Sequence, residues 1–279
     1  MEALHPHPGP RRTYRRVLTI AGSDSGGGAG IQADLKTFAA LGCYGMSAVT
    51  ALTAQNTVGV SGIHPVPPEF AAAQISAVLE DIGADAVKIG MLYSAELIRV
   101  VAEQLRKFNA RNIVLDPVMV AQSGDRLLRD DAVGAMTEHL MPLADVVTPN
   151  IPEAEVLLGR TIRSVEELRQ AARDLGRFGS RSVLVKGGHR EEADSSDLLY
   201  MCREDRFVTL TAERVGSRNT HGTGCTLSSA IAARLAGGDT LEDAVSRAKE
   251  YISRAIRAGA RYSLGRGHGP VHHFFNYWV

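Results

Sequence analysis

The sequence is poor in cysteine, with only Cys43, Cys202 and Cys225 among its 279 residues. Three scattered thiols are too few for a disulfide framework or for a zinc site made of thiolates. The chain also lacks an apolar run long enough to span a bilayer, and residues 1–14 lack the apolar core of a signal peptide. We therefore expect a cytoplasmic protein without a membrane partner, whose residues 1–14 form a disordered tail.

A net charge is missing as well, because 31 basic and 31 acidic side chains cancel. This balance argues against electrostatic capture of nucleic acid. Apolar residues make up 44 % of the chain and charged residues 22 %, proportions that suffice for a full hydrophobic core. For a chain of this length we expect one α/β domain over residues 15–279, with a small molecule as its partner.

Short apolar segments rich in Val and Ile alternate with longer stretches of helical period, which is typical of βαβ units around a mostly parallel sheet. Strands are predicted at Val17–Ala21, Tyr44–Ala51, Ala86–Ile89, Ile113–Asp116, Val146–Thr148 and Ser182–Lys186, and an antiparallel hairpin at Leu198–Met201 and Phe207–Leu210. Helices are predicted at Ile31–Leu41, Glu69–Ile82, Ala95–Phe108, Asp131–Leu140, Val165–Phe178, Thr223–Leu235 and Leu241–Ala258. Ser164 with Glu167, and Thr240 with Asp243, have the spacing of helix caps.

The clearest motif is the glycine-rich segment 22–30, GSDSGGGAG, which follows a predicted strand and precedes a predicted helix. Its five glycines would let backbone amides approach a ligand closely, although a flexible turn is the simpler interpretation. The segment does not match the dinucleotide fingerprint, because Ile31 stands where the third glycine should follow. A dinucleotide oxidoreductase is therefore disfavoured. The sequence contains no Walker A motif either.

A second motif, NTHGTGCT at Asn219–Thr226, leads directly into a predicted helix. The amides of Gly222, Thr223 and Gly224 would lie at the helix N-terminus, where partial positive charge stabilises a transferring phosphoryl group. Cys225 would lie in the first turn, where the helix dipole is expected to lower its pKa and favour the thiolate. The alternative is that Cys225 is a small core residue.

Polar residues also follow several other predicted strands, at the sheet edge where a doubly wound fold binds its ligands. Asp116 follows one strand, and Asn150 and Glu153 follow the next. Glu153 could hold Mg²⁺ through water, whereas capping a helix is an equally good interpretation of Asn150. Lys186 ends a further strand, in Lys186–His189 (KGGH), and could place an ammonium group on a phosphate.

In this order the motifs resemble those of the hydroxymethylpyrimidine/phosphomethylpyrimidine kinases of thiamine biosynthesis, members of the ribokinase superfamily. The resemblance runs from about Val17 to the C-terminus. It implies a ribokinase-like three-layer α/β/α fold with a mostly parallel sheet and no separate lid, the use of ATP and Mg²⁺, and a homodimer. The matching segments are Ala21–Lys36 (AGSDSGGGAGIQADLK), Thr53–Thr57 (TAQNT), Lys88–Leu92 (KIGML), Leu115–Val118 (LDPV), Thr148–Glu153 (TPNIPE), Lys186–His189 (KGGH), Asn219–Thr226 (NTHGTGCT) and Gly269–Phe274 (GPVHHF).

The resemblance also assigns roles to individual residues. A side-chain amide such as that of Gln55 can both donate to and accept from an aminopyrimidine edge, and Met91 and Val118 would sandwich the ring. Thr53 stands where a relative carries valine. The substrate-binding positions are Gly22, Asp24, Ala29, Gln55, Met91 and Val118, and the nucleotide-binding positions are Asp116, Asn150, Lys186, Asn219, Thr220 and Thr223, with Glu153 at the metal.

For catalysis, the resemblance puts Cys225 where sugar kinases of the superfamily carry an aspartate base, with Gly222 and Gly224 in the anion hole. Asp24 is the reserve candidate for the base. The implied reactions are phosphorylation of hydroxymethylpyrimidine and then of its monophosphate. Two alternatives are a pyridoxal or pyridoxine kinase, and a non-catalytic ligand sensor on the same fold, which would be free to lose Glu153, Gly224 or Cys225.

Overall fold

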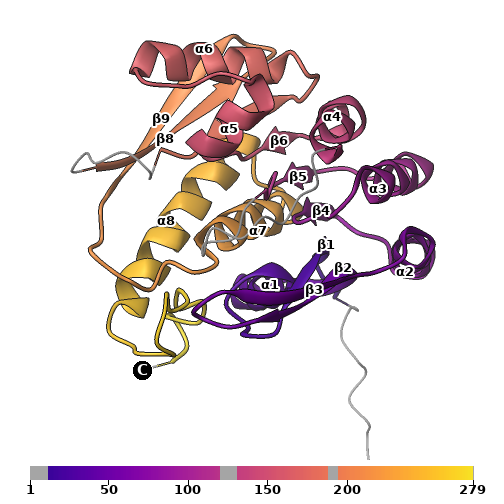
Figure 1. Ribbon diagram of the computed structural model, residues 1–279, viewed down its shortest axis with the longest axis horizontal. Helices are drawn as coiled ribbons and strands as arrows, with labels where there is room; N and C mark the ends of the chain where they lie inside the picture. The colour runs from indigo at the N-terminus through magenta and orange to yellow at the C-terminus, as the bar shows by residue number, and fades with distance from the viewer. Residues whose placement is uncertain (1–11, 120–130, 188–193, 279) are drawn as a thin grey trace, which may run out of the picture.

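The computed structural model describes residues 12–119, 131–187 and 194–278. Within these residues a nine-stranded sheet has the strand order β3-β2-β1-β4-β5-β6-β7-β8-β9 (Figure 1). Six neighbouring strands, from β2 to β7, run parallel, whereas β3 pairs antiparallel with β2, and β8 antiparallel with β7 and β9. The strands are β1 (Arg16–Asp24), β2 (Tyr44–Gln55), β3 (Val60–Pro65), β4 (Ala86–Ile89), β5 (Ile113–Leu115), β6 (Val146–Val147), β7 (Ser182–Val185), β8 (Asp194–Met201) and β9 (Arg206–Glu213).

The helices cover both faces of the sheet, which confirms the predicted three-layer α/β/α fold (Figure 1). One face packs against α1 (Gly30–Ala40), α7 (Thr223–Ala236) and α8 (Leu241–Gly259). The other packs against α2 (Pro68–Asp81), α3 (Ala95–Lys107), α4 (Ala132–Ala135), α5 (Ile151–Leu158) and α6 (Val165–Gly176). Central strands such as β4 and β7 are buried along their whole length, because helices lie above and below them.

Two elements were missing from the sequence prediction. β3 has only weak apolar alternation, and it is held in the sheet by pairing with the end of β2, which itself extends to Gln55. The helix α5 begins at Asn150, where a capping box forms with Glu153. The hairpin strands β8 and β9 are also longer than predicted. The predicted tail at residues 1–14 lies mostly outside the described residues.

A third difference concerns the predicted helix over residues 131–140, which is broken. The α-helical part ends at Ala135 and is followed by a π-helical turn, Met136–Leu140, and a 3₁₀ turn, Met141–Leu143. Pro142 cannot supply the backbone N–H that a continuing helix needs. The predicted caps at Ser164 and Thr240 are both present.

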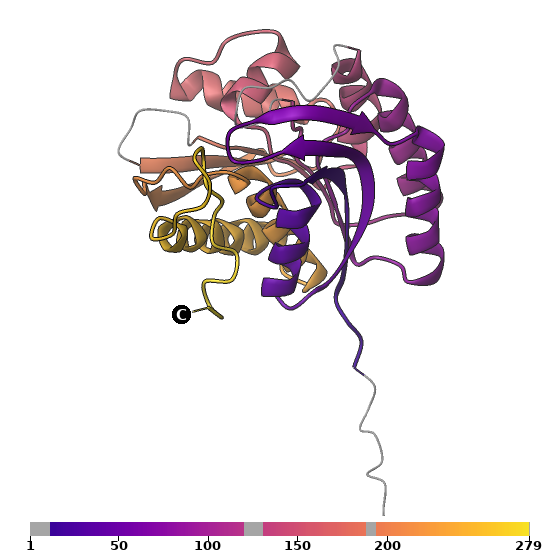
Figure 2. The same cartoon turned by 60° about the horizontal axis from the view of Figure 1, so that its bottom comes forward.

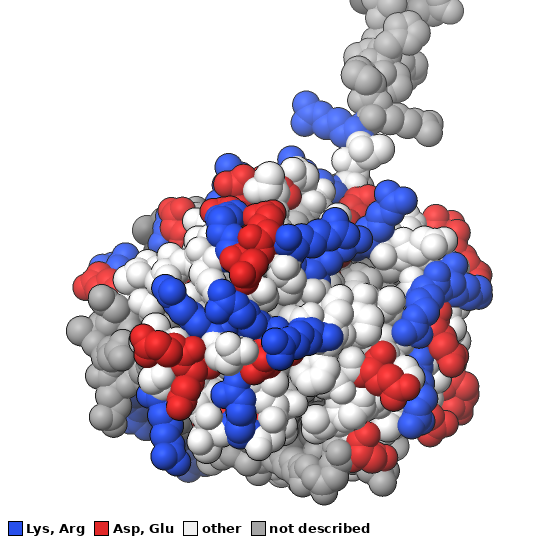
Figure 3. All heavy atoms as spheres, turned by 90° about the horizontal axis from the view of Figure 1, so that it is seen from above, with Lys and Arg blue, Asp and Glu red and all other residues white. Residues whose placement is uncertain are grey.

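The surface seen from above in Figure 3 carries basic and acidic side chains close to one another, in keeping with the balanced charge of the chain. No helix within the described residues is long and apolar enough to cross a membrane. The C-terminal segment returns past α8 toward the loop between β2 and β3 (Figure 2), where the His268 amide donates to the Thr57 carbonyl at 2.9 Å.

Candidate active site

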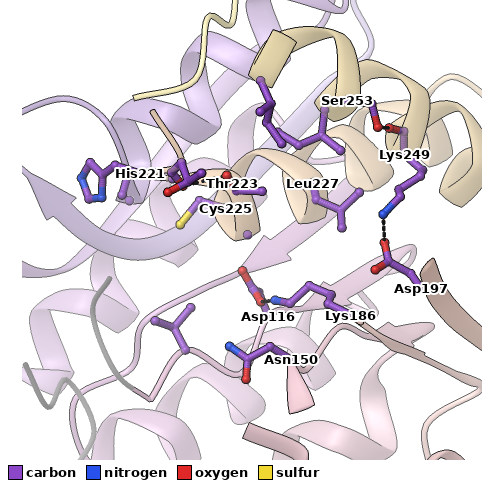
Figure 4. A pocket seen from close by; sticks show the side chains of 18 of the residues that line it. Asp116, Asn150, Lys186, Asp197, His221, Thr223, Cys225, Leu227, Lys249 and Ser253 are labelled. Atoms are coloured by element: carbon purple, nitrogen blue, oxygen red, sulfur yellow. Dashed lines mark hydrogen bonds and ion pairs between the residues drawn. The ribbon is translucent and has the colours of Figure 1, made fainter. Parts of the chain in front are cut away.

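A cleft of about 680 Å³ opens at the carboxyl ends of the parallel strands, between these ends, the N-terminus of α7 and one side of α8. Of the residues that the sequence assigns to a site, all except Asn219 line it. Figure 4 shows Thr223 and Cys225 at the start of α7, facing Asp116, Lys186 and Asn150. The tertiary structure therefore brings together motifs that lie up to two hundred residues apart in the chain.

The glycine-rich segment 22–30 folds around the carboxylate of Asp24. This group accepts hydrogen bonds from the amides of Gly26, Gly28 and Ala29 at 2.8–3.0 Å. The amides that were expected to approach a ligand therefore bind a side chain of the loop itself. Small residues are needed here for packing, because a Cβ at Gly28 would overlap His221.

Asp24 is also bound to His221, whose Nε2 lies 2.8 Å from the Asp24 Oδ2. Burial alone would raise the pKa of Asp24, but the hydrogen bonds from His221 and the loop amides lower it below its usual range. With its oxygens already bound, this carboxylate is better placed to hold the loop against α7 than to accept a proton from a substrate. Sequence reasoning missed His221, although it lies inside the NTHGTGCT motif.

The first turn of α7 begins at Gly222, whose φ of 77° is unfavourable for other residues, and a Cβ there would overlap the Gly28 carbonyl. Within the described parts of the chain, the amides of Gly224 and Cys225 have no acceptor. A Cβ on Gly224 would lie 3.4 Å from Lys186 Nζ and 3.6 Å from Asp116 Oδ2. Amides without an acceptor and an ammonium group thus lie close together at the start of α7, as the anion-hole hypothesis requires.

The predicted lowering of the Cys225 pKa is wrong for this site. Burial raises the pKa of the Cys225 thiol to about 11, and the nearby Lys88 only partly opposes this shift. The carboxylates of Asp34 and Asp116 raise it further. The helix dipole that motivated the prediction is therefore outweighed by desolvation and by two neighbouring negative charges.

Lys186 forms the positive centre of the opposite wall. Its Nζ lies 2.9 Å from the Asp116 Oδ1 and 3.8 Å from the Glu153 Oε2. Burial would lower the pKa of Lys186, but Asp116 and Glu153 outweigh burial and raise it, so the ammonium group stays charged. Asp116 also accepts a hydrogen bond from Ser228 of α7 at 3.1 Å, which ties this wall to the helix.

Glu153 takes part in the helix cap that the sequence left open as one interpretation of its motif. Its carboxylate accepts from the Asn150 amide, and the Asn150 side chain accepts from the Glu153 amide, both at 2.8 Å. Burial raises the pKa of Glu153 to about 7, with Lys186 opposing and Asp116 adding to the shift. A cation nearby would stabilise the ionised carboxylate, so the group fits a role in holding Mg²⁺.

Metal ligands are otherwise sparse. Among the residues that the structure describes, no cluster of three or more His, Cys, Asp or Glu side chains could hold an ion.

The predicted pyrimidine-binding residues line the end of the cleft beside β2, away from Lys249 and Asp197. Gln55 ends β2, and its Oε1 lies 3.1 Å from the hydroxyl of Thr53, which also donates to the Ser23 carbonyl. Thr53 therefore orients Gln55 without lining the cleft itself. Met91 and Val118 belong to one small apolar cluster beside it. Gln55 could therefore bind the polar edge of a ring, while Met91 and Val118 contact its apolar face.

The far half of the cleft was not predicted as a site. It is lined by residues 212–217, at the end of β9 and directly after it, and by the apolar side chains of Leu227 on α7 and of Ile252 and Ile256 on α8. At its end Lys249 Nζ lies 2.7 Å from Asp197 Oδ2, and the other Asp197 oxygen accepts from the Gly187 amide (Figure 4). The sequence predicted a helix at Leu241–Ala258 but did not indicate that any of its residues line a cleft.

Asn219 is not among the residues that line the cleft, and its assignment to the nucleotide stays a prediction. Its side-chain amide donates to the carbonyls of Gly259 and Tyr262, at 2.6 and 2.7 Å. The residue therefore holds the chain after α8 against the start of α7. His189, the last residue of the KGGH motif, lies outside the described residues.

Comparisons with known proteins match nearly the whole chain. The family described as phosphomethylpyrimidine kinase matches residues 24–272. The chain is 57 % identical, over 92 % of its length, to the thiamine biosynthesis bifunctional protein ThiED of Geobacter sulfurreducens, but covers only 52 % of that protein. It is 55 % identical to the hydroxymethylpyrimidine/phosphomethylpyrimidine kinase of Rhizobium meliloti, covering 94 % of this chain and 98 % of that kinase.

Solved structures give the same picture. A phosphomethylpyrimidine kinase from Clostridium difficile is 45 % identical, with a TM-score of 0.77 over 86 % of this chain and 99 % of that one. A pyridoxal kinase from Staphylococcus aureus, in complex with AMP-PCP and pyridoxal, is 38 % identical, with a TM-score of 0.86 over 95 % and 96 %. The fold of this chain is therefore similar to that of a phosphomethylpyrimidine kinase and to that of a pyridoxal kinase.

Proposed function

Because the chain belongs to the phosphomethylpyrimidine kinase family, we propose that it transfers the γ-phosphoryl group of ATP to hydroxymethylpyrimidine and then to the resulting monophosphate. The observation that carries this proposal is the position of Gly224. Its Cα lies beside Lys186, and its amide and that of Cys225 have no acceptor within the described residues, in a cleft with a polar and an apolar wall for a ring at one end. Such a site can hold a phosphoryl group between two substrates.

In the first reaction the hydroxymethyl oxygen forms a bond to the γ-phosphorus while the bond to the ADP leaving oxygen breaks. The amides of Gly224 and Cys225, with Lys186, stabilise the charge on the transferring group. The alcohol proton passes to the Cys225 thiolate. Because the pKa of the resting thiol is about 11, Cys225 must ionise first, and this route becomes faster as the pH rises.

In the second reaction the acceptor is the phosphate of the first product, which is already an anion near neutral pH. No alcohol proton has to be removed, so alignment and charge neutralisation carry this step. Lys186 and the amides of α7 serve both reactions, whereas Cys225 serves chiefly the first. One cleft is therefore sufficient for two successive transfers.

The nucleotide is placed in the far half of the cleft. Its base would pack against Ile252 and Ile256 of α8, and its phosphates would reach Lys186 and the start of α7. Asp116, Asn150, Thr220 and Thr223 line the path between these ends. A magnesium ion held through water by Glu153 would neutralise charge on the β- and γ-phosphates.

A pyridoxal kinase is the second candidate, because pyridoxal kinases are among the similar solved structures, with TM-scores of 0.86. The same Gln55, Met91 and Val118 could accept a pyridine ring. The two substrates differ in the groups around the ring, so turnover distinguishes them.

The site is further proposed to work in a homodimer in the cytoplasm, without a nucleic-acid partner. The balanced charge and the three free cysteines of the chain support this setting. Light scattering of the purified protein would give a mass of twice 29.9 kDa if the dimer is correct.

The decisive assay for the proposed function measures ADP release with hydroxymethylpyrimidine, its monophosphate and pyridoxal offered separately. We expect turnover with the first two substrates and a markedly lower kcat/KM with pyridoxal. Turnover with pyridoxal alone would assign the second candidate function. No turnover with any of them, despite measurable binding of ATP, would favour the sensor.

A further inference from the structure

A fully buried ion pair lies at the floor of the cleft and has no part in the mechanism above. Lys88, on β4, places its Nζ 3.0 and 2.9 Å from the two carboxylate oxygens of Asp34, on α1. Both side chains have zero exposure. Removing two charges from water is costly, and apolar residues often replace such pairs without loss of stability. Stability alone is therefore a weak reason for this pair.

The pair is connected to the helix that carries the anion hole. Asp34 also accepts hydrogen bonds from Thr19 of β1 at 2.6 Å and from Ser229 of α7 at 2.7 Å. Four elements, β1, β4, α1 and α7, thus meet at one carboxylate. Ser229 lies four residues after Cys225, so the two side chains project from the same side of α7.

The hydroxyl of the preceding residue, Ser228, holds α7 from a second direction. Ser228 donates to Asp116, the partner of Lys186, at 3.1 Å. The helical turn that begins at Cys225 therefore ends at two serines that donate to Asp116 and to Asp34. Lys88 itself lines the cleft together with Cys225, and a Cβ at Gly90 would lie only 2.7 Å from its Nζ. The ammonium group is confined between the backbone and the floor of the site.

Four charged groups act on Cys225 from the elements around it. Lys88 and Lys186 are positive, and Asp34 and Asp116 are negative. Lys88 favours the thiolate, whereas Asp34 and Asp116 disfavour it. Removing either member of the Lys88–Asp34 pair would leave the other charge uncompensated, and the two removals act on the thiol with opposite signs.

We propose that Lys88 and Asp34 are positioning residues that act as one unit, holding the N-terminal half of α7 through Ser229 and balancing the charge beneath Cys225. This inference rests on the proposed function only in taking Cys225 as the acceptor of the alcohol proton. The arrangement itself is a property of the ligand-free protein.

The test uses the alkylation of Cys225 in the full chain without ligands. Parent, Asp34→Asn, Lys88→Met and the double variant are treated with iodoacetamide between pH 7 and 10, and the modified peptides are quantified by mass spectrometry. Cys202 serves as an internal reference, because it follows β8 at the opposite edge of the sheet and is also half-buried. Its rate should be the same in all four proteins.

We expect Asp34→Asn to speed Cys225 alkylation at pH 8 by about tenfold or more, the effect of lowering a pKa by one unit. Lys88→Met should not speed it, and the double variant should return to within about threefold of the parent, as expected for a coupled pair. If both single variants change the rate in the same direction, or if Asp34→Asn leaves it unchanged, the proposal is wrong.

Ser229→Ala is the matched control for packing, because it removes one hydrogen bond to Asp34 and leaves both charges in place. It should lower the melting temperature but leave the pH dependence of alkylation within about twofold of the parent. A shift as large as that of Asp34→Asn would mean that helix position, and not charge, controls Cys225. Because no turnover is measured, failure of this proposal and failure of the kinase assay are separate results.

Discussion

The Nζ of Lys186 lies between two carboxylates, 2.9 Å from Asp116 Oδ1 and 3.8 Å from Glu153 Oε2. Its positive charge therefore neutralises the charge of Asp116 more fully than that of Glu153. The pKa of Asp116 is lowered despite its burial, chiefly by Lys186, whereas burial raises that of Glu153 to about 7. One ammonium group cannot neutralise two buried carboxylates. The remaining negative charge would be neutralised by a bound cation, which makes Glu153 the first residue to test.

Glu153→Gln should lower kcat in both reactions and raise the Mg²⁺ concentration needed for half-maximal rate, because the ionised carboxylate is proposed to hold the hydrated ion. Excess Mg²⁺ should restore part of the activity. Glutamine can keep the capping box, so the fold should persist. Reduced activity that does not respond to Mg²⁺ would make Glu153 a structural residue.

The same substitution should stabilise the ligand-free protein at high pH. The folded-state pKa of Glu153, about 7, exceeds its ordinary value of 4.5, so the parent loses stability as the pH rises between these values. Urea unfolding should show Glu153→Gln more stable by about 1–3 kcal/mol at pH 8. The difference should nearly vanish at pH 4.5. An equal difference at both pH values would contradict the raised pKa.

Cys225→Ala should harm the first phosphorylation about 10²–10⁴-fold more than the second, because only the alcohol must lose a proton. The amides of the anion hole survive this change and still serve the second step. In the parent, the rate of the first step should keep rising from pH 7 to pH 10, since the pKa of Cys225 is about 11.

The two steps are measured with hydroxymethylpyrimidine and with its monophosphate, and Cys225→Ser is the control of similar shape. Both variants should lose the rise with pH. Equal losses in the two steps would instead indicate that Cys225 packs against the substrate or fixes the start of α7.

Gln55→Leu should weaken binding of hydroxymethylpyrimidine by about 1–3 kcal/mol, because polar groups of the ring edge would be left unpaired. Titration calorimetry should show an unchanged affinity for ATP. Thr53→Val, which removes the hydroxyl that orients Gln55, should have a smaller effect of the same kind. Equal affinity of Gln55→Leu and the parent for the pyrimidine would place the ring elsewhere.

Asn219→Ala should lower stability by about 1–3 kcal/mol through the loss of its two hydrogen bonds to the carbonyls of Gly259 and Tyr262. The KM for ATP should not change, since Asn219 lies outside the cleft. Chemical unfolding and steady-state kinetics on the same preparation decide between the roles. A higher KM without a loss of stability would return Asn219 to the nucleotide.

The sequence by itself determined the βαβ order, the mostly parallel sheet and the motifs that meet in the cleft, and the family resemblance of these motifs implied the three-layer fold. These features depend on local patterns: buried strands are short apolar runs, helices show their period and their caps, and glycines mark close approaches. Residues that follow strands could be placed at one edge of the sheet, because the carboxyl ends of parallel strands lie together. Fifteen of the residues assigned to the site accordingly line one cleft.

Only the tertiary structure decided the state of the groups in that cleft. The pKa of Cys225 depends on burial and on Lys88, Asp34 and Asp116, which come from three other elements. The helix dipole, which a sequence does reveal, is weaker than this combination. Asn219 likewise belongs to a matching motif, yet its amide is used by carbonyl groups forty residues later. Electrostatics and hydrogen bonding depend on distances between distant segments, and these distances exist only after the chain has folded.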